Sequence, residues 1–230
     1  MRIKCVLFNI EDTLYDATMQ INMARLNSIK AMIEAGLPAD LQNTYDSLEE
    51  IVKEYGPNYN RHFDRLLERL GLKWNPRVIA AGVIAYRETS AAYLKPYPDT
   101  VPVLLKLRES GYTLGAISEG LAVKQWQKLT QLGIQHLFHH LITSEEIGED
   151  RVTIKLFKKI LSQLKVTPKE TLFVGNKLDT DISSANQLSI VSARIRKGKF
   201  KTEEPSSPNM TPKYEISRLS ELIQILEETK

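Results

Sequence analysis

Residues 4–16 read KCVLFNIEDTLYD, and the fold of the chain depends on this stretch. Its first part, residues 4–10, is a short apolar run rich in residues that favour β-strands. A continuous apolar run of this length is typical of a central parallel strand that is covered on both faces. Because Asn9, Glu11 and Asp12 lie at its end, we expect a buried strand that leads into a polar loop.

The chain changes its pattern directly after this strand. Residues 16–92 contain long segments in which apolar residues recur at helical spacing, with almost no signal for strands. Pro38, Pro57 and Pro76 punctuate these segments, as residues at helix boundaries do. We therefore expect four or five helices and no strand in this region.

Strands and helices alternate after Pro98. The expected strands are 4–10, 112–118, 140–144, 171–176, 190–195 and 214–216, and the expected helices are 99–109, 121–132, 152–165, 179–187 and 218–228. Such alternation indicates βαβ units and a parallel sheet. The sequence therefore predicts an α/β fold with a doubly wound, Rossmann-like parallel sheet. Residues 1–15 and 93–230 form this core domain, and an all-helical domain is inserted at 16–92.

Composition and charge narrow the classes of function. The chain has 230 residues, of which 42% are hydrophobic and 26% charged, and its formal net charge is +3. This charge is too small to indicate a nucleic acid or an anionic membrane as partner. With Cys5 as its one cysteine the chain forms no internal disulfide, which favours a cytoplasmic location. No stretch approaches the ~18 apolar residues of a membrane span, and the N-terminus lacks a secretory pattern.

Polar residues gather where three of the expected strands end. They are residues 9–13 after the first strand, Ser118-Glu119-Gly120 after the second, and Gly175-Asn176 with Asp179 and Asp181 after the strand at 171–176. In open parallel sheets, ligands bind outside the carboxyl ends of the strands. The sequence therefore predicts a site at this edge of the sheet.

These segments resemble known motifs. LFNIEDTLYD (7–16) resembles the first motif of the haloacid dehalogenase superfamily, an apolar strand followed by Asp-x-Asp-x-Thr. ISEG (117–120) resembles the second motif, and VGNKLDTDI (174–182) resembles the fourth. Their order, and the helical insertion after the first motif, are similar to the helical-cap subgroup of the phosphatase lineage. The likeness covers essentially the whole chain.

The resemblance implies a mechanism and a cofactor. In that family a first Asp attacks phosphorus, and the Asp two residues later acts as acid and base. A hydroxyl and backbone amides hold the phosphoryl oxygens, a Lys offsets negative charge, and acidic residues bind Mg²⁺, a hard cation that prefers carboxylate oxygens.

Several of these positions hold other residues here. Asn9 stands at the nucleophile position, Glu11 at the acid/base position and Asn176 at the first acid of the fourth motif, while Ser118 and Asp181 are retained. Aligning GEDRVTIKLF (148–157) through its Phe with the third motif puts Arg151 at the lysine position. The resemblance thus implies the catalytic positions Asn9, Glu11, Ser118 and Arg151, the phosphate-binding residues Ser118, Glu119, Gly120 and Arg151, and the metal-binding residues Asp181, Asn9, Glu11 and Asn176.

These replacements favour impaired or lost catalysis. A carboxamide is neutral and a poor nucleophile, so Asn9 is not expected to form an acyl-phosphate. With two amides at the metal, Asp181 remains, helped at most by Asp179 or Glu11, and weak Mg²⁺ binding is expected. The leading interpretation is therefore a pseudoenzyme of the phosphatase lineage that binds phosphate or a small phosphorylated molecule, or that serves as a scaffold for a protein partner.

Other interpretations stay open. The first alternative is an active Mg²⁺-dependent phosphatase for small phosphorylated metabolites, with Glu11 as base for direct attack by water. Ser118 to Gly120 form either an anion cradle or a plain helix cap. The histidines at 136–140 are interpreted as loop residues rather than metal ligands. The basic cluster at 194–201 is interpreted as a solvated loop, and nucleic-acid binding is a distant third function.

Overall fold

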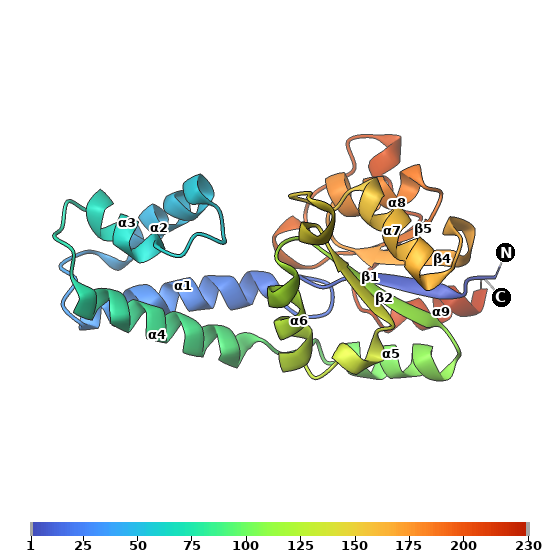
Figure 1. Cartoon of the computed structure of the whole chain (residues 1–230), viewed down its shortest axis with the longest axis horizontal. Helices are drawn as coiled ribbons and strands as arrows, with labels where there is room; N and C mark the ends of the chain where they lie inside the picture. Colours follow the sequence, from blue (N-terminus) through green and yellow to red (C-terminus); the bar gives the residue numbers. More distant parts are fainter. Residues whose placement is uncertain (1, 229–230) are drawn as a thin grey trace. The chain divides into compact units, whose positions relative to one another are not determined.

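The chain divides into two compact units. The structure, a computed structural model, describes residues 2–228. One unit comprises the chain up to Thr18 and from Leu94 onward, and the other comprises Met19–Tyr93. The first unit contains all the strands of the described residues (Figure 1).

A single parallel sheet forms the centre of the first unit. Its six strands are β1 (Cys5–Asn9), β2 (Thr113–Ser118), β3 (His140–Thr143), β4 (Thr171–Gly175), β5 (Val191–Ile195) and β6 (Tyr214–Ile216). They lie in the order β3-β2-β1-β4-β5-β6, and every neighbouring pair is parallel. The predicted doubly wound parallel sheet is confirmed.

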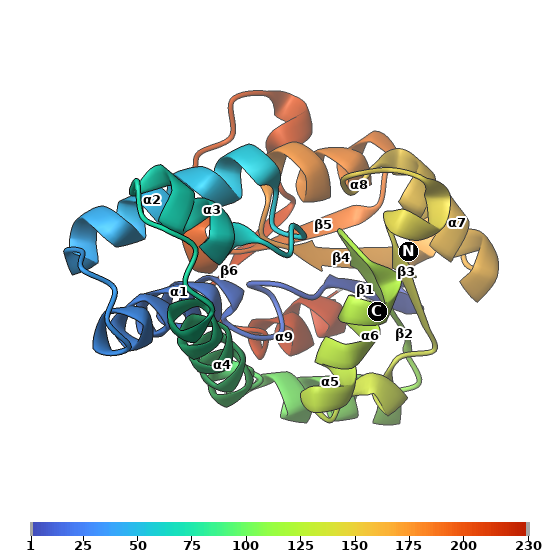
Figure 2. The ribbon, with the colours of Figure 1, turned by 60° about the vertical axis from the view of Figure 1, so that its left-hand side comes forward.

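Helices cover both faces of the sheet. They are α5 (Thr100–Glu109), α6 (Ala122–Gln131), α7 (Ile154–Leu164), α8 (Ser183–Gln187) and α9 (Glu221–Glu228). Alternate residues of β1 point to opposite faces: Val6 and Phe8 join the core that α5, α6 and α9 cover, and Cys5 and Leu7 join the core under α7 and α8. Figure 2 shows α7 and α8 on one side of the sheet and α5 and α9 on the other. A strand buried on both faces explains why its sequence is a continuous apolar run.

The strand order places one crevice at the carboxyl edge of the sheet. The chain builds outward from β1 through β2 to β3, and then returns to the other side of β1 with β4. The loops that leave β1 and β4 therefore diverge in opposite directions, and ligands bind at such a switch point. Asn9 is the last residue of β1, and Asn176 directly follows the last residue of β4. The switch point thus lies where the sequence predicts a site.

The second unit is helical. Within residues 19–93, all of which the structure describes, there is no strand; the helices are α1 (Ala17–Glu34), α2 (Leu41–Tyr55), α3 (His62–Arg69) and α4 (Pro76–Tyr93). Their shared core contains Ile29, Met32, Leu48, Ile51 and Leu66, all nearly inaccessible to solvent. Asp40 caps α2 by accepting a hydrogen bond from Asn43 N at 2.9 Å. Across the described residues, no helix is long and apolar enough to cross a membrane.

Two local features differ from the sequence prediction. The helix expected at 179–187 begins with a π-helical turn, Leu178–Ile182, before α8. Arg194, assigned from sequence to an exposed basic cluster, lies in β5 with its side chain fully buried. Its guanidinium donates hydrogen bonds to Phe200 O at 2.8 Å and to Glu215 of β6 at 3.3 Å. A neighbouring strand supplies the compensating carboxylate, which sequence spacing does not reveal.

Phe157 gives a test of the core under α7. Its ring is fully buried and packs edge-on against Phe173 of β4, with centroids 4.8 Å apart. We expect Phe157→Ala to lower the free energy of unfolding by about 3–5 kcal/mol, measured by urea denaturation, because the cavity would not refill. Val123→Ala, at a side chain on α6 that is 68% exposed, is the control and should change it by less than about 0.5 kcal/mol. A loss below 1 kcal/mol for Phe157→Ala, on the order of a surface substitution, would contradict this packing.

Candidate active site

Asn9 lies at the centre of a cluster of oxygen atoms. Its side-chain nitrogen, Nδ2, donates to Asn176 Oδ1 at 3.1 Å, to Glu11 O at 3.1 Å and to Asp181 Oδ2 at 3.4 Å. The side chains of Asn9, Asn176 and Asp181 are almost completely buried. The structure therefore brings together residues from β1 and from the loop after β4, which are 167 or more positions apart in the chain.

The orientation of the Asn9 amide follows from its neighbours. Ile10 N donates to Asn9 Oδ1 at 2.8 Å, so the oxygen must face the backbone of the next residue. The opposite orientation would set the NH₂ group against this N–H and would remove the hydrogen bonds from Asn9 to Glu11 O and Asn176 Oδ1. The amide nitrogen therefore faces Glu11 O, Asn176 Oδ1 and Asp181 Oδ2.

The π-helical turn positions Asp181. Its Oδ2 accepts backbone hydrogen bonds from Asn176 N at 3.1 Å and Lys177 N at 3.2 Å, which ties the turn to the end of β4. Gly175 allows this approach, because a Cβ there would lie 2.5 Å from Asp181 Oδ2. Turns of this type often occur at functional sites.

Burial dominates the acidity of Asp181. Removal from water raises the pKa of this carboxyl to about 6, although the charge of Lys177 and the two backbone hydrogen bonds oppose the shift. Its second oxygen, Oδ1, is buried and accepts no hydrogen bond. Asp181 is thus a carboxylate whose ionised form is only partly satisfied by the protein.

Glu11 is held by side chains of α6. Lys128 forms an ion pair with its carboxylate, and Gln125 Nε2 donates to the same oxygen at 3.5 Å. Burial alone would raise the pKa of Glu11, but the charge and hydrogen bond of Lys128, together with the charge of Lys177, hold it below its ordinary value. Glu11 is therefore ionised at neutral pH.

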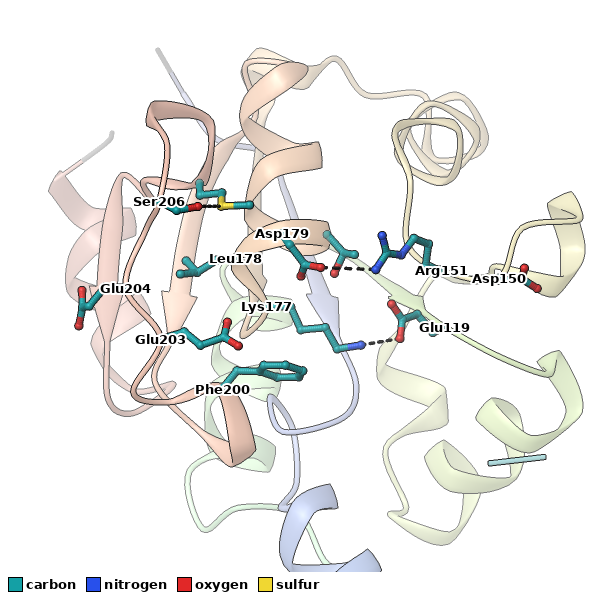
Figure 3. Close-up of a pocket in the computed structure, with 12 residues that line it drawn as sticks. Glu119, Asp150, Arg151, Lys177, Leu178, Asp179, Phe200, Glu203, Glu204 and Ser206 are labelled. Carbon is teal, nitrogen blue, oxygen red and sulfur yellow. Dashed lines mark hydrogen bonds and ion pairs between the residues drawn. The ribbon is translucent and has the colours of Figure 1, made fainter. Parts of the chain in front are cut away.

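Lys177 forms the second ion pair of the site, with Glu119. Burial alone would lower the pKa of Lys177, but the charges of Glu119, Asp181 and Glu11 raise it above its ordinary value. Its ammonium also lies 5.8 Å from the centroid of the Phe200 ring, a cation–π distance. Figure 3 shows the lysine side chain extending from the end of β4 toward Glu119, which follows β2. Lys177 thus carries its charge into the switch point.

The amides after β2 have protein acceptors. Gly120 N donates to Ser144 Oγ at 2.9 Å, and Ala122 N donates to Glu145 Oε2 at 2.8 Å. Ser118 ends β2 with a buried side chain, and its hydroxyl donates weakly to Glu119 O at 3.4 Å. An anion at this edge would therefore compete with Ser144 and Glu145 for these amides.

A cavity of about 630 Å³ adjoins this group of residues (Figure 3). Lys177 and Glu119 line it on one side, and Arg151 and Asp179 form a pair at 3.5 Å on another. The Arg151 side chain is 64% exposed, whereas that of Lys177 is 20% exposed. Arg151 thus lines the cavity mouth, and Lys177 is the cation closer to Glu11 and Asp181.

Two residues that the motif comparison did not select therefore belong to the site, Lys128 and Lys177. A signal for each is present in the sequence. Lys177 directly follows Asn176 at the predicted carboxyl edge, and Lys128 lies one helical turn after Gln125 on the same face of α6.

The remaining basic residues of the 194–201 cluster include Arg196, which pairs with Glu204 and Glu215.

This arrangement defines a class of protein. An all-parallel sheet, with carboxylates, amides and lysines gathered at its switch point, is that of a doubly wound α/β protein with a polar ligand site. The model of the haloacid dehalogenase-like hydrolase family matches residues 6–195. The chain belongs to this family, and the resemblance found in its motifs is confirmed.

Two relatives of nearly equal length are named for the same activity. A glyceraldehyde 3-phosphate phosphatase of Methanopyrus kandleri is 49% identical over 228 residues, covering 98% of both chains. One of Methanocaldococcus jannaschii is 39% identical and covers 99% of both. The chain is thus similar to phosphatases of its family along its whole length.

Solved structures agree in fold. The HAD-hydrolase YfnB of Bacillus subtilis, bound to magnesium, superposes with a TM-score of 0.70 at 20% identity, covering 98% of this chain and 99% of that one. The L-2-haloacid dehalogenase RSc1362 also gives a TM-score of 0.70 at 20% identity, covering 99% and 100%. At this level of identity the similarity concerns the fold alone.

The oxygen cluster of this chain does not fit a divalent cation. Mg²⁺ takes charged oxygen ligands in octahedral geometry, and among the described residues Asp181 is the one carboxylate that accepts a hydrogen bond from the Asn9 amide. The centre of the cluster faces a hydrogen-bond donor, Asn9 Nδ2. Among residues 2–228, no group of three or more His, Cys, Asp or Glu side chains is arranged to hold a metal.

Asp181 gives a test through pH. Because folding raises its pKa from 3.8 to about 6, its contribution to stability is fully present below pH 3.8 and is lost as the pH rises through 6. The variant Asp181→Asn lacks this titration. We expect the free energy of unfolding of the variant minus that of the parent protein to rise by on the order of 3 kcal/mol from pH 4 to pH 7. Urea denaturation in EDTA measures both proteins, and a difference that stays constant with pH would contradict the burial of this charge.

Proposed function

We propose that the chain is a phosphatase for a small phosphorylated metabolite, of the class to which glyceraldehyde 3-phosphate belongs. The observation that carries this proposal is the similarity along the full chain to phosphatases named for that substrate, at up to 49% identity in the comparisons above. The site supports it by placing an ionised carboxylate, a buried hydroxyl and two lysines at the carboxyl edge of β1, β2 and β4.

Glu11 is the acid/base group of the proposed reaction. The neutral Asn9 amide is a poor nucleophile, so the attack on phosphorus falls to water. A water proton passes to the Glu11 carboxylate as the new P–O bond forms, and the P–O bond to the leaving oxygen breaks. Glu11 then returns the proton to the leaving alkoxide. Lys128 keeps Glu11 ionised and so available as a base, and because it lowers the pKa of Glu11 it favours the return of the proton to the alkoxide.

Lys177 and Ser118 are the proposed phosphoryl-binding residues. The ammonium of Lys177 lines the cavity and can exchange its partner Glu119 for a phosphoryl oxygen. The Ser118 hydroxyl makes one weak hydrogen bond at 3.4 Å and is therefore easily redirected toward a ligand. Arg151, at the exposed mouth of the cavity, would meet the far end of a short metabolite.

A second candidate function is binding of the same ligand without turnover. One observation favours it: the side chain at the nucleophile position is an amide whose nitrogen is committed to three oxygens. This is the interpretation to which the motif residues alone point. The comparisons favour the phosphatase instead, because relatives named for this activity match the chain from end to end.

The two functions are separated by one pair of assays. We expect the parent protein to hydrolyse glyceraldehyde 3-phosphate measurably, but about 10⁴-fold or more slowly than Asn9→Asp/Asn176→Asp with Mg²⁺, because the variant regains a nucleophile and two metal carboxylates. Release of inorganic phosphate is the measurement, with a generic aryl phosphate as second substrate. Glu11→Gln in the parent background should abolish the remaining rate, since an amide cannot act as base.

Each result favours one function. If the parent releases no phosphate above the buffer rate while the double variant turns over, the phosphatase proposal fails and binding without turnover replaces it. If the parent already equals the double variant, the site works well without an aspartyl nucleophile. Activity that survives Glu11→Gln would remove Glu11 from its proposed role.

A further inference from the structure

The centre of the oxygen cluster is already occupied by a donor from the protein. The three oxygens around Asn9 Nδ2 come from the β1 loop, from the end of β4 and from the π-helical turn, at 3.1, 3.1 and 3.4 Å. A hard cation is bound by oxygens that converge in this way. Here the two N–H groups of Asn9 face the converging oxygens, and Asp181 Oδ2 also accepts hydrogen bonds from Asn176 N and Lys177 N. The orientation of the Asn9 amide is fixed by the hydrogen bond of 2.8 Å from Ile10 N.

The acidic charges of the site are also matched within the chain. Glu11 is paired with Lys128, and Glu119 is paired with Lys177. Asp181 is the one carboxylate of the three without a lysine partner, and its Oδ2 accepts hydrogen bonds from Asn9 and two backbone amides. Three carboxylates and two ammonium groups leave a charge of −1, which one divalent cation would overcompensate. Without a ligand, the electrostatic demand for such an ion is therefore small, and the negative charge of a bound phosphoryl group falls to Lys177.

Lys177 is the lysine of the two ion pairs that lines the cavity. Lys128 pairs with Glu11 and does not line the cavity, whereas Lys177 lines it near Phe200 (Figure 3). Lys177 directly follows Asn176 just after the end of β4, so its charge enters the site beside one of the residues of the oxygen cluster. Because Lys177 belongs to the chain, its positive charge is present in the site without any metal ion from solution.

We propose that this site binds a phosphoryl group through Lys177 in place of a divalent cation, with the Asn9 amide nitrogen occupying the centre of the oxygen cluster. The proposal rests on the proposed function only for the nature of the ligand, a phosphoryl dianion. It concerns binding, and it is therefore independent of whether the bound ester is hydrolysed.

The test measures binding of Mg²⁺ and of inorganic phosphate separately, by calorimetric titration of the EDTA-treated protein. For the parent we expect no saturable Mg²⁺ binding, and phosphate binding that is unchanged by EDTA. Asn9→Asp/Asn176→Asp should gain Mg²⁺ binding, because two carboxylates then replace the amide donor and its partner. Lys177→Gln should weaken phosphate binding by about tenfold or more, as loss of a charge-assisted hydrogen bond does.

Two control variants keep the result interpretable. Lys177→Arg retains the charge and should retain most of the phosphate affinity, which separates loss of charge from misfolding. Lys169→Gln removes an exposed lysine just before the other end of β4, and should leave phosphate binding unchanged. Circular dichroism of each variant checks that the fold is kept.

Three outcomes would overturn the proposal: saturable Mg²⁺ binding by the parent with an affinity like that of the double variant, phosphate binding that requires Mg²⁺ or is absent under both conditions, or unchanged affinity in Lys177→Gln. The proposed function fails differently. A parent that binds phosphate through Lys177 but releases none from an ester loses the phosphatase assignment and keeps this inference. A parent whose hydrolysis depends on Mg²⁺ keeps the assignment and loses the inference.

Discussion

The hydrogen bond from Asn9 Nδ2 to Asn176 Oδ1 joins the two strands at which the sheet changes direction. β1 and β4 are neighbours in space because the chain returns to the first strand after completing β3, and this return opens the crevice at their carboxyl ends. A bond between two neutral amides is modest in free energy, about 1 kcal/mol net. Its importance is that both groups are buried, so losing either partner would leave a polar atom unsatisfied. The site is therefore built around a contact that uses no charge.

The ion pairs of the site are linked to the presence of neutral amides at positions 9 and 176. With amides at both positions, Lys128 and Lys177 pair with the carboxylates Glu11 and Glu119, while the third carboxylate, Asp181, accepts hydrogen bonds from backbone amides. The Glu11–Lys128 pair joins the loop after β1 to helix α6, and the Glu119–Lys177 pair joins the loop after β2 to the loop after β4. Breaking one partner of such a buried or half-buried pair leaves an uncompensated charge, which costs more than the pair contributes. The lysines thus hold the site together and also charge it.

Much of the fold could be predicted from the sequence, and the reason is local. Runs of apolar residues in the sequence predict the six strands and the alternating helices. The polar residues that follow β1, β2 and β4 mark the edge of the sheet where ligands bind. The roles of Lys177 and Lys128 could not be read in this way. Each depends on which strands are neighbours, and on a carboxylate more than 50 positions away in the chain. Arg194 escaped prediction for the same reason, since its burial is possible only because β6 brings Glu215 beside it.

Similarity to phosphatases and a site with unusual residues are compatible, because fold and chemistry depend on different positions. The identity shared with the archaeal relatives extends over the whole chain, and most of it must serve the sheet, its helices and the helical unit. The chemistry depends on a few side chains at the switch point, where Asn9, Asn176 and Lys177 determine the charge. A metal ion supplies positive charge that is lost when the ion dissociates. A lysine supplies a smaller charge that is always present. Its ammonium stands on a flexible side chain, so it cannot fix the positions of the three oxygens of a transferring phosphoryl group as a coordinated ion does. Such an exchange preserves recognition of a phosphoryl group better than it preserves the rate of its transfer.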